Sequence, residues 1–300
     1  MILHLFSSAK TEQLCGIMTV PFYQVNAFTQ DLFKGNIAGV CVLPNPGAAS
    51  ADAAASLATA AAAEAASALL QSVATETNHP ATAFISRQGE DFALRWFSPK
   101  RELPLCGHGT LAAAHVLREQ GWLTPDSPAR FHTLGGILTV RLLPGDWIEL
   151  EFPVFTYAPA VLPDSLAAAF PTIPRQVVFA HDRYLVELES EAAVREYQPD
   201  FNKMRDDRVV ITALSDPGKP YDFVSRFFAV SLGVYEDAVT GSAHCALAPF
   251  WAQRLGKQVM TAYQASARGG TLRVRLEGEK VFIAGQALTV LKGDIAFPTY

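Results

Sequence analysis

The sequence predicts an α/β protein made of two related lobes, with a small-molecule site in the cleft between them. Half of its 300 residues are apolar and only 18% are charged, so that a substantial core can be buried. Short apolar segments typical of strands are interleaved with alanine-rich segments typical of helices. One arrangement of strand, irregular loop and helix start occurs once in each half of the chain. These observations favour two lobes of related fold over a solenoid of short repeats.

Strands are expected where short segments alternate in polarity or are uniformly apolar, namely 19–28, 39–43, 81–87, 92–97, 130–134, 137–143, 147–152, 176–179 and 184–188. The alanine-rich stretch 48–74 predicts a long helix. Low-complexity sequence is the alternative, but the larger apolar residues near its end favour a docked helix. A further helix is expected over 110–119, ended by Gly121. Residues 98–105, which include two prolines, are expected to form a loop.

The second half of the chain repeats a pattern of the first. Arg95-Trp96-Phe97 precedes Gly109 by nearly the same distance as Arg226-Phe227-Phe228 precedes Gly241. In both halves an arginine-aromatic strand leads through an irregular loop to a glycine and an apolar helix. A shift of 132 positions superimposes the two glycines. This repeat at the scale of a domain predicts two lobes facing each other across a cleft.

Residues 1–17 contain neither a long apolar run nor a basic segment followed by one, so they predict neither a signal peptide nor a membrane span. Met18 opens the first expected strand, and residues 1–17 are interpreted as an N-terminal extension. With no export signal, a cytoplasmic location and no membrane partner are expected. The four cysteines show no C-x-x-C spacing, which fits a reducing compartment.

Other classes of protein are disfavoured by the composition and by missing motifs. A formal net charge of -5 without basic clusters argues against a nucleic-acid partner. Residues 107–112 formally match a dinucleotide fingerprint, but they do not directly follow a strand, so an NAD-linked oxidoreductase is the least favoured alternative and no cofactor is expected. Neither a phosphate-binding P-loop nor a G-x-S-x-G elbow occurs. The histidines lack metal-ligand spacing, and helix N-termini repel cations, so no metal is expected.

The most informative feature is a pair of helix entrances at 106–110 and 237–242. A helix start exposes unpaired N–H groups at the positive end of the helix dipole, and glycine lets a ligand approach the backbone. Two such starts facing each other would bind an anion, most simply the carboxylate of a small-molecule substrate. The alternative is that each is merely a well-capped helix. The expected substrate-binding residues are Gly107, Gly109, Thr110, Thr240, Gly241 and Ser242.

Three side chains beside these glycines are candidates for acid–base catalysis. Asp237 is the best candidate, because a partner such as Glu236 would raise the pKa of one carboxylate, whereas a helix N-terminus would lower it. Its alternative role is a plain charge at the start of a helix. His108 is suited to donate to a substrate carbonyl or to carry a proton, unless it is only a hydrogen-bonded loop residue. Cys106 has a lowered thiol pKa if the helix start acts on it, and is inert if it is buried.

Longer stretches around these residues resemble the PhzF-like (phenazine-biosynthesis-like) proteins. The resemblance is carried by residues 25–29, 33–36, 94–99, 102–112, 226–228, 236–247 and 266–270. It implies an α/β (α+β) fold of the diaminopimelate epimerase-like kind, in which two pseudo-symmetric lobes each wrap a sheet around a central helix. The first lobe is expected to comprise 18–129 plus 287–300, with a final strand around 287–291 returning to it, and the second to comprise 130–286.

The resemblance also implies a chemistry. Members of this family move a proton on a small carboxylate-bearing metabolite without a cofactor, as isomerases or epimerases, and a homodimer is expected on the same analogy. Asp237 and His108 fall on active-site positions of the family, and Gly241-Ser242 falls on its ligand-binding turn. The family motif N-L-S-E-T-x-F corresponds to residues 78–84, so its catalytic glutamate falls on Ala81. Alanine cannot carry a proton.

Two hypotheses follow from this departure. In the first, the protein is an isomerase that uses Asp237 with His108 or Cys106. Its motivation is that Cys106 and Asp237 occupy near-equivalent places in the repeat, as a racemase with two bases requires. In the second, the protein is a catalytically impaired relative that binds a metabolite through the intact carboxylate site.

Overall fold

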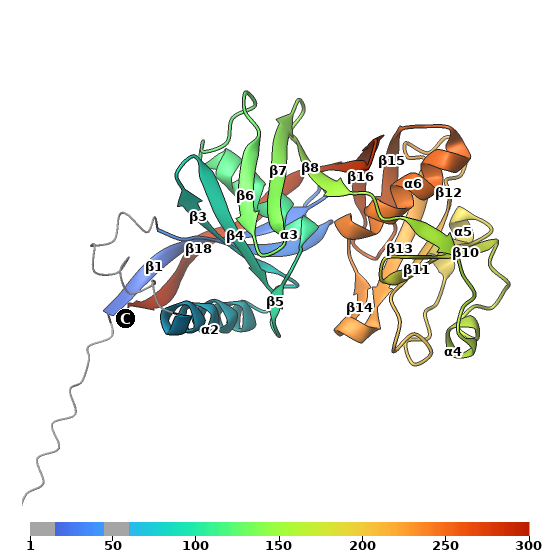
Figure 1. The fold of residues 1–300 in the computed structure, drawn as a ribbon, viewed down its shortest axis with the longest axis horizontal. Coiled ribbons are helices and arrows are strands. Elements are labelled where there is room, and N and C mark those ends of the chain that lie inside the picture. The colour runs from blue at the N-terminus through green and yellow to red at the C-terminus, as the bar shows by residue number, and fades with distance from the viewer. Residues whose placement is uncertain (1–15, 45–59, 300) are drawn as a thin grey trace, which may run out of the picture.

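A computed structural model describes residues 16–44 and 60–299, which form two lobes side by side along the long axis of the molecule (Figure 1). The elements of the first half are β1 (Gly16–Ala27), β2 (Asn36–Val42), α2 (Ala60–Thr77), β3 (Thr82–Gln88), β4 (Asp91–Phe97), β5 (Glu102–Leu103), α3 (Gly107–Glu119), β6 (Ala129–Thr133) and β7 (Gly136–Leu143). The elements of the second half are β8 (Trp147–Pro153), β9 (Tyr157–Pro159), α4 (Asp164–Ala167), β10 (Gln176–Ala180), β11 (Arg183–Glu187), α5 (Glu191–Glu196), β12 (Val209–Leu214), β13 (Phe223–Ala229), η1 (Val230–Leu232), β14 (Val234–Asp237), η2 (Gly241–Ala243), α6 (His244–Leu255), β15 (Val259–Gln264), β16 (Gly270–Glu277), β17 (Lys280–Gly285) and β18 (Ala287–Thr299).

The first lobe wraps its strands around α3. β1 pairs with β2 and with β18, β2 runs parallel to β3, and β3 is followed by β4 and β6. Strands β1, β2, β3, β8 and β18 all contact α3, whose residues from Gly109 to Leu117 are buried. A helix that is apolar on every side is stable only inside a sheet that closes around it, and this explains the run Leu111-Ala112-Ala113-Ala114.

The second lobe repeats this arrangement around α6, which contacts β15, β16 and β17. Pro249 lies inside α6 and has no N–H to donate to the carbonyl of Cys245, one turn earlier. That carbonyl instead accepts the N–H of Phe155 at 3.0 Å, so a strand-to-strand connection of this lobe satisfies the group that proline leaves free. Strands β8 and β17 pair with each other and connect the two lobes.

Helix α2 lies on the outside of the first lobe (Figure 1). Its apolar face, which includes Leu70, Val73 and Ala74, packs against Val20 and Phe84 in a separate small core. This confirms the docked helix expected within 48–74, although the helix continues to Thr77, and residues 48–59 lie outside the described residues.

The predicted strands are all present, with ends that differ by a few residues. β1 begins at Gly16, which pairs with Thr299, so two residues assigned to the N-terminal extension belong to the sheet. β18 returns to β1 as expected but extends to Thr299 (Figure 1). The expected loop 98–105 contains the short strand β5, and α3 begins at Gly107 instead of Thr110. The lobe boundaries stay a prediction; β6, at the expected boundary, is hydrogen-bonded to β4.

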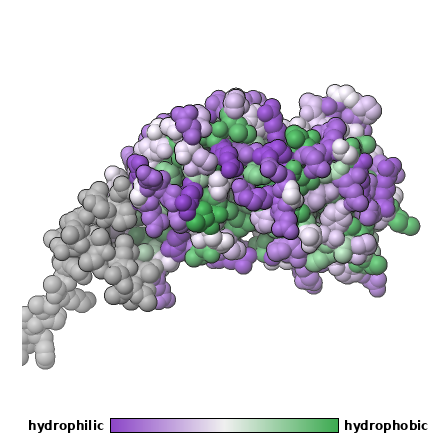
Figure 2. All heavy atoms as spheres, turned by 45° about the horizontal axis from the view of Figure 1, so that its top comes forward, coloured by the Kyte–Doolittle hydropathy of each residue, from purple (hydrophilic) through white to green (hydrophobic). Residues whose placement is uncertain are grey.

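Among the described residues, no helix has the length and apolar character needed to span a membrane. On the face shown in Figure 2, hydrophilic residues dominate, and hydrophobic residues appear in separate groups over both lobes. Apolar side chains scattered in this way are ordinary for a folded chain and do not by themselves mark a partner.

Candidate active site

The two predicted helix entrances meet in the cleft. A Cβ placed on Gly107 would lie 3.5 Å from Cα of Gly241, and one placed on Gly241 would lie 3.6 Å from Cα of Gly107. The N-cap residues are Cys106 for α3 and Thr240 for η2, and neither side chain makes a capping hydrogen bond. N–H groups of both first turns therefore lie without a side-chain cap at the positive ends of two helices, except that the N–H of Gly109 interacts with the Cys106 sulfur.

The contact between these glycines corrects the predicted register of the repeat. Gly107, not Gly109, is the counterpart of Gly241. The side chains one turn into each helix agree: the hydroxyl of Thr110 donates to the carbonyl of Cys106 (2.7 Å), and Nδ1 of His244 donates to the carbonyl of Thr240 (2.9 Å). The hydroxyl of Thr110, expected to bind substrate, is thus occupied within its own helix.

Each lobe carries an arginine–glutamate clamp ahead of its helix start. Arg95 donates to both carboxylate oxygens of Glu102 at 2.7 Å, and Arg226 donates to those of Glu236 at 2.7 and 3.0 Å. Glu236 is therefore paired with an arginine and does not form the carboxylate pair with Asp237 that the sequence suggested.

The clamps also show where Asp237 belongs in the repeat. Leu103 pairs with Trp96 in the first lobe, as Asp237 pairs with Phe227 in the second. The counterpart of Asp237 is consequently Leu103, and the counterpart of the N-cap Cys106 is Thr240. The near-equivalence of Cys106 and Asp237, which motivated a racemase with two matched bases, is wrong.

The Asp237 carboxylate is held by two donors from opposite lobes. Nδ2 of Asn36 donates to Oδ1 at 2.7 Å, and the hydroxyl of Thr240 donates to Oδ2 at 2.5 Å. The buried amide of Gln264 donates to the carbonyl of Asp237 at 2.8 Å, and its oxygen accepts the N–H of Thr240. Hydrogen bonds to both oxygens fix the direction of the carboxylate.

Two of these supporting residues were not predicted. Asn36 begins β2 and joins the site only because its lobe folds against Val239, whose carbonyl it also contacts at 2.8 Å. Gln264 lies in a strand far along the chain, and no sequence signal marks it. Sequence periodicity identifies faces of elements but not which polar side chain completes a site across a cleft.

Cys106 and His108 lie beside this carboxylate with altered protonation. Burial raises the pKa of the Cys106 thiol to about 12; the N–H of Gly109 opposes this rise and the charge of Asp237 adds to it. Burial also lowers the pKa of His108, against a smaller opposite effect of Asp237. The Cys106 sulfur is 3.6 Å from Nδ1 and 3.8 Å from Nε2 of His108. Near neutral pH the site holds a protonated thiol and a neutral imidazole, so the lowered thiol pKa considered from the sequence is wrong.

Stability is expected to fall as the pH rises above about 9, because three buried thiols keep their protons in the folded protein. Burial raises the pKa of Cys41, Cys106 and Cys245 from 9.0 to about 12. Above pH 9.0 the unfolded chain binds fewer protons than the folded one, so the free energy of unfolding falls by up to about 1.4 kcal/mol per thiol and pH unit. Urea unfolding between about pH 8 and 10.5 measures this slope. Cys106→Ala should lower the slope by about one third; an unchanged slope would contradict the burial effect.

The position expected for the family glutamate is fully buried. Ala81 has no exposed surface and belongs to the main core, with its carbonyl accepting the N–H of Gly39. Glu76 is exposed near the end of α2, as the sequence suggested. Among the described residues, no group of three or more His, Cys, Asp or Glu is arranged to hold a metal ion.

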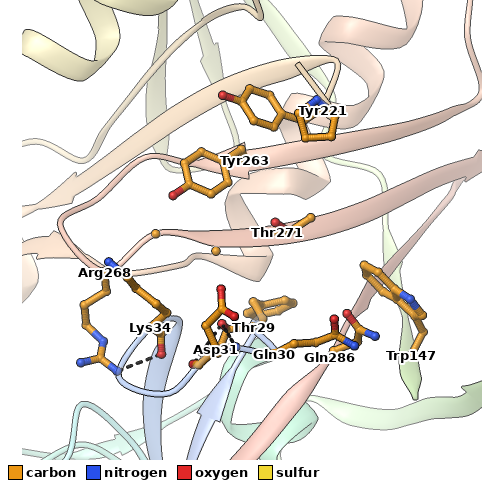
Figure 3. Close-up of a pocket in the computed structure, with 14 residues that line it drawn as sticks. Thr29, Gln30, Asp31, Lys34, Trp147, Tyr221, Tyr263, Arg268, Thr271 and Gln286 are labelled. Atoms are coloured by element: carbon orange, nitrogen blue, oxygen red, sulfur yellow. Dashed lines mark hydrogen bonds between the residues drawn. The ribbon is translucent and has the colours of Figure 1, made fainter. Parts of the chain in front are cut away.

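A separate cavity of about 380 Å³ lies between the loop 28–34 and strands β15 and β16 (Figure 3). Figure 3 shows Arg268 reaching across it to the carbonyl of Lys34, at 2.9 Å. Phe28 closes the side toward the helix starts, because its ring lies 3.6 Å from the Cβ position of Gly241. No predicted catalytic residue lines this cavity. At this cavity Arg268 of the second lobe binds the loop that leads to Asn36.

Two lobes that each wrap a sheet around a buried helix, with the helix starts meeting in the cleft, define the diaminopimelate epimerase-like class of folds. Among solved structures, the chain is similar to a phenazine biosynthesis protein of the PhzF family from Enterococcus faecalis, with a TM-score of 0.80 and 33% identity over 93% of this chain and 99% of that one. A hydroxyproline epimerase from Agrobacterium vitis shares the fold at a TM-score of 0.55 and 14% identity, over 94% of this chain and 93% of that one.

Sequence comparisons identify the family. The family model for phenazine biosynthesis-like proteins matches residues 25–293. The chain is also 41% identical over 284 residues to an uncharacterized isomerase of Halalkalibacterium halodurans, covering 93% of this chain and 99% of that protein. The protein therefore belongs to the phenazine biosynthesis-like (PhzF) family, which confirms the resemblance seen in its sequence.

Proposed function

We propose that this protein is a cofactor-independent isomerase that moves a proton on a small carboxylate-bearing metabolite, with Asp237 as the proton acceptor. The observation that carries the proposal is the Asp237 carboxylate, fixed by Asn36 and Thr240 beside two helix starts without a side-chain cap. The names of related proteins as isomerases support the same class of reaction.

Binding of the substrate carboxylate falls to the helix starts at Gly107 and Gly241. Backbone N–H groups at two helix N-termini stabilise an anion without a charged side chain, and the absence of Cβ atoms lets the two helix starts lie in contact, so that both can act on one ligand. Gly109 has a different role, because a Cβ there would lie 2.8 Å from the ring of Trp96 and 3.0 Å from the Cys106 sulfur. It allows α3 to pack, and its N–H, which interacts with the Cys106 sulfur in the absence of ligand, is the one group through which it is proposed to contact the substrate.

The chemistry is the transfer of a proton between two positions of the substrate. The Asp237 carboxylate takes a proton from a carbon next to an activating group, and the electron pair of the broken C–H bond is delocalised toward that group. The proton is then returned at another carbon or face, from Asp237 or from the protonated Cys106. His108, neutral in this site, donates a hydrogen bond to the developing negative charge. No net oxidation or reduction occurs.

Exchange with heavy water tests this function. The protein is incubated in deuterium oxide with a panel of small unsaturated or α-substituted carboxylates, and incorporation of deuterium at carbon is followed by NMR. We expect exchange into at least one compound. Asp222→Asn is a suitable control for the loss of an aspartate, and it should leave the exchange unchanged, because Asp222 pairs with Lys257 in a different part of the second lobe. Absence of exchange across the panel and across a metabolite extract would contradict the proposal.

A binding protein without turnover is the second candidate, and Ala81 favours it. A missing general acid or base lowers a rate by about 10²–10⁴. Asp237 is the one carboxylate among the predicted site residues. A second group for proton transfer would therefore have to be a carboxylate of the substrate or Cys106. Any deuterium incorporation that depends on Asp237 excludes this candidate.

We also propose a homodimer, on the family resemblance alone. Sedimentation equilibrium measures the mass directly, and a value near the 32.4 kDa of one chain would contradict the dimer.

A further inference from the structure

Arg183 is a buried arginine next to the second helix start, and the proposed reaction does not use it. It begins β11 and is only 6% exposed. Its Nη1 donates to the hydroxyl of Ser242 at 3.2 Å, and its guanidinium lies over the ring of Phe227 at 5.0 Å. Since Phe227 pairs with Asp237 across β13 and β14, Arg183 packs on the direct neighbour of the proposed catalytic carboxylate.

The charge around Arg183 is not balanced by the described residues. Nε of Arg183 donates to Asp182 at 2.6 Å, but the other oxygen of that carboxylate is bound by Arg208. Two arginines therefore share one carboxylate, and the positive end of the helix formed by η2 and α6 lies at Ser242 beside them. A buried cation without a full counter-charge is unfavourable, so an anion bound here would be strongly stabilised.

The guanidinium also has a donor group to spare. Its hydrogen bonds to Asp182 and Ser242 come from Nε and Nη1, and within the described residues Nη2 makes none. Nη2 is not completely enclosed, so solvent reaches part of it. Ser242, whose hydroxyl Nη1 contacts, is partly exposed at the helix start. Nη1 and Nη2 together form the planar fork that binds a carboxylate or phosphate through two hydrogen bonds.

We propose that Arg183 binds a second anionic group of the substrate, so that this protein acts on small dianions. One carboxylate lies at the helix starts of Gly107 and Gly241, and the second anionic group, a carboxylate or a phosphate, lies at Arg183 and Ser242. This inference rests on the proposed function for the first carboxylate site. Arg183 is a specificity residue and takes no part in proton transfer.

Calorimetric binding of matched ligands tests the inference without requiring turnover. The probes are succinate, glutarate and adipate, each compared with its monoamide, which keeps the shape but loses one charge. For the best-fitting length we expect the diacid to bind at least about tenfold more tightly than its monoamide. Arg183→Gln should reduce this ratio to about one, and Arg183→Lys should keep part of it. Arg118→Gln, which removes a guanidinium paired with Asp146 at the far end of α3, should leave the ratio unchanged.

The outcomes separate this inference from the proposed function. Three results would overturn the proposal that the substrate is a dianion. They are a diacid-to-monoamide affinity ratio near one in the unmodified protein, no binding of any diacid, and an unchanged ratio in Arg183→Gln. An arginine with only a structural role would lower the affinity for diacid and monoamide alike. If no deuterium exchange is found but the diacid still binds more tightly than its monoamide, the proposed isomerase activity is contradicted and the proposed dianionic ligand is not. The phosphonate analogue of the best diacid distinguishes phosphate from carboxylate, because the true second group binds more tightly.

Discussion

Replacement of Asp237 by asparagine is expected to slow deuterium incorporation into the substrate by about 10²–10⁴-fold, the usual effect of removing a general base. The change keeps the size of the side chain, and its oxygen still accepts the hydrogen bond of Asn36. The hydroxyl of Thr240 can reverse and accept from the new amide. The position is thus retained while the ability to take a proton is lost. NMR under single-turnover conditions measures the rate with the compound found in the exchange screen.

Binding must be measured on the same variant. Asp237→Asn should bind the compound with an affinity within a few-fold of the unmodified protein, because the carboxylate of the substrate is held by the helix starts. An exchange rate equal to that of the unmodified protein would remove Asp237 from the chemistry. A lost rate together with lost binding would instead make Asp237 a binding residue.

Replacement of Arg226 by methionine is expected to lower the free energy of unfolding by about 3 kcal/mol, because it leaves buried main-chain carbonyls as well as Glu236 without their donor. The side chain of Arg226 is 11% exposed, and its Nη1 also donates to the carbonyl of Tyr197 at 2.7 Å. Methionine replaces most of the volume but none of these donors. Urea unfolding monitored by tryptophan fluorescence gives the change directly.

The first lobe supplies the matched control for this prediction. Arg95 makes the equivalent clamp with Glu102, but its side chain is 31% exposed. Arg95→Met leaves a glutamate as exposed as Glu236 (23% against 22%) but leaves no buried carbonyl of the described residues without its donor, so the expected loss is about 1 kcal/mol or less. Equal losses for the two variants would show that the buried carbonyls bound by Arg226 contribute little.

Much of the fold was predictable because it depends on local patterns. The short alternating strands, the alanine-rich helix that ends at Thr77 and the return of the last strand are confirmed. The run Leu111-Ala112-Ala113-Ala114 is apolar on all sides, and such a segment can only be buried. The two helix entrances were recognisable from glycine and hydroxyl residues ahead of an apolar run.

The register of the repeat was not predictable, for a physical reason. The arginine strand and the helix start are connected by a short hairpin through β5 in the first lobe, and by a longer one through η1 and β14 in the second. The spacing from the arginine strand therefore favours Gly109 as the counterpart of Gly241, whereas the contact across the cleft selects Gly107. The same limit applies to Asn36, Gln264 and Arg183. Their importance comes from contacts between segments that are far apart in the chain.

The meeting of Gly107 and Gly241 gives the cleft an approximate twofold axis that its functional side chains do not obey. The counterpart of Asp237 in the other lobe is Leu103, and the counterpart of Cys106 is Thr240. Under the proposed function, a ligand at the two helix starts therefore lies beside one carboxylate and one thiol that keeps its proton, and not beside two matched bases. Of these two groups, Asp237 is the proposed proton acceptor, because a thiol that keeps its proton cannot accept another. The backbone of the site is approximately symmetric, but its side chains are not. This difference fixes which side chain starts the proposed proton transfer.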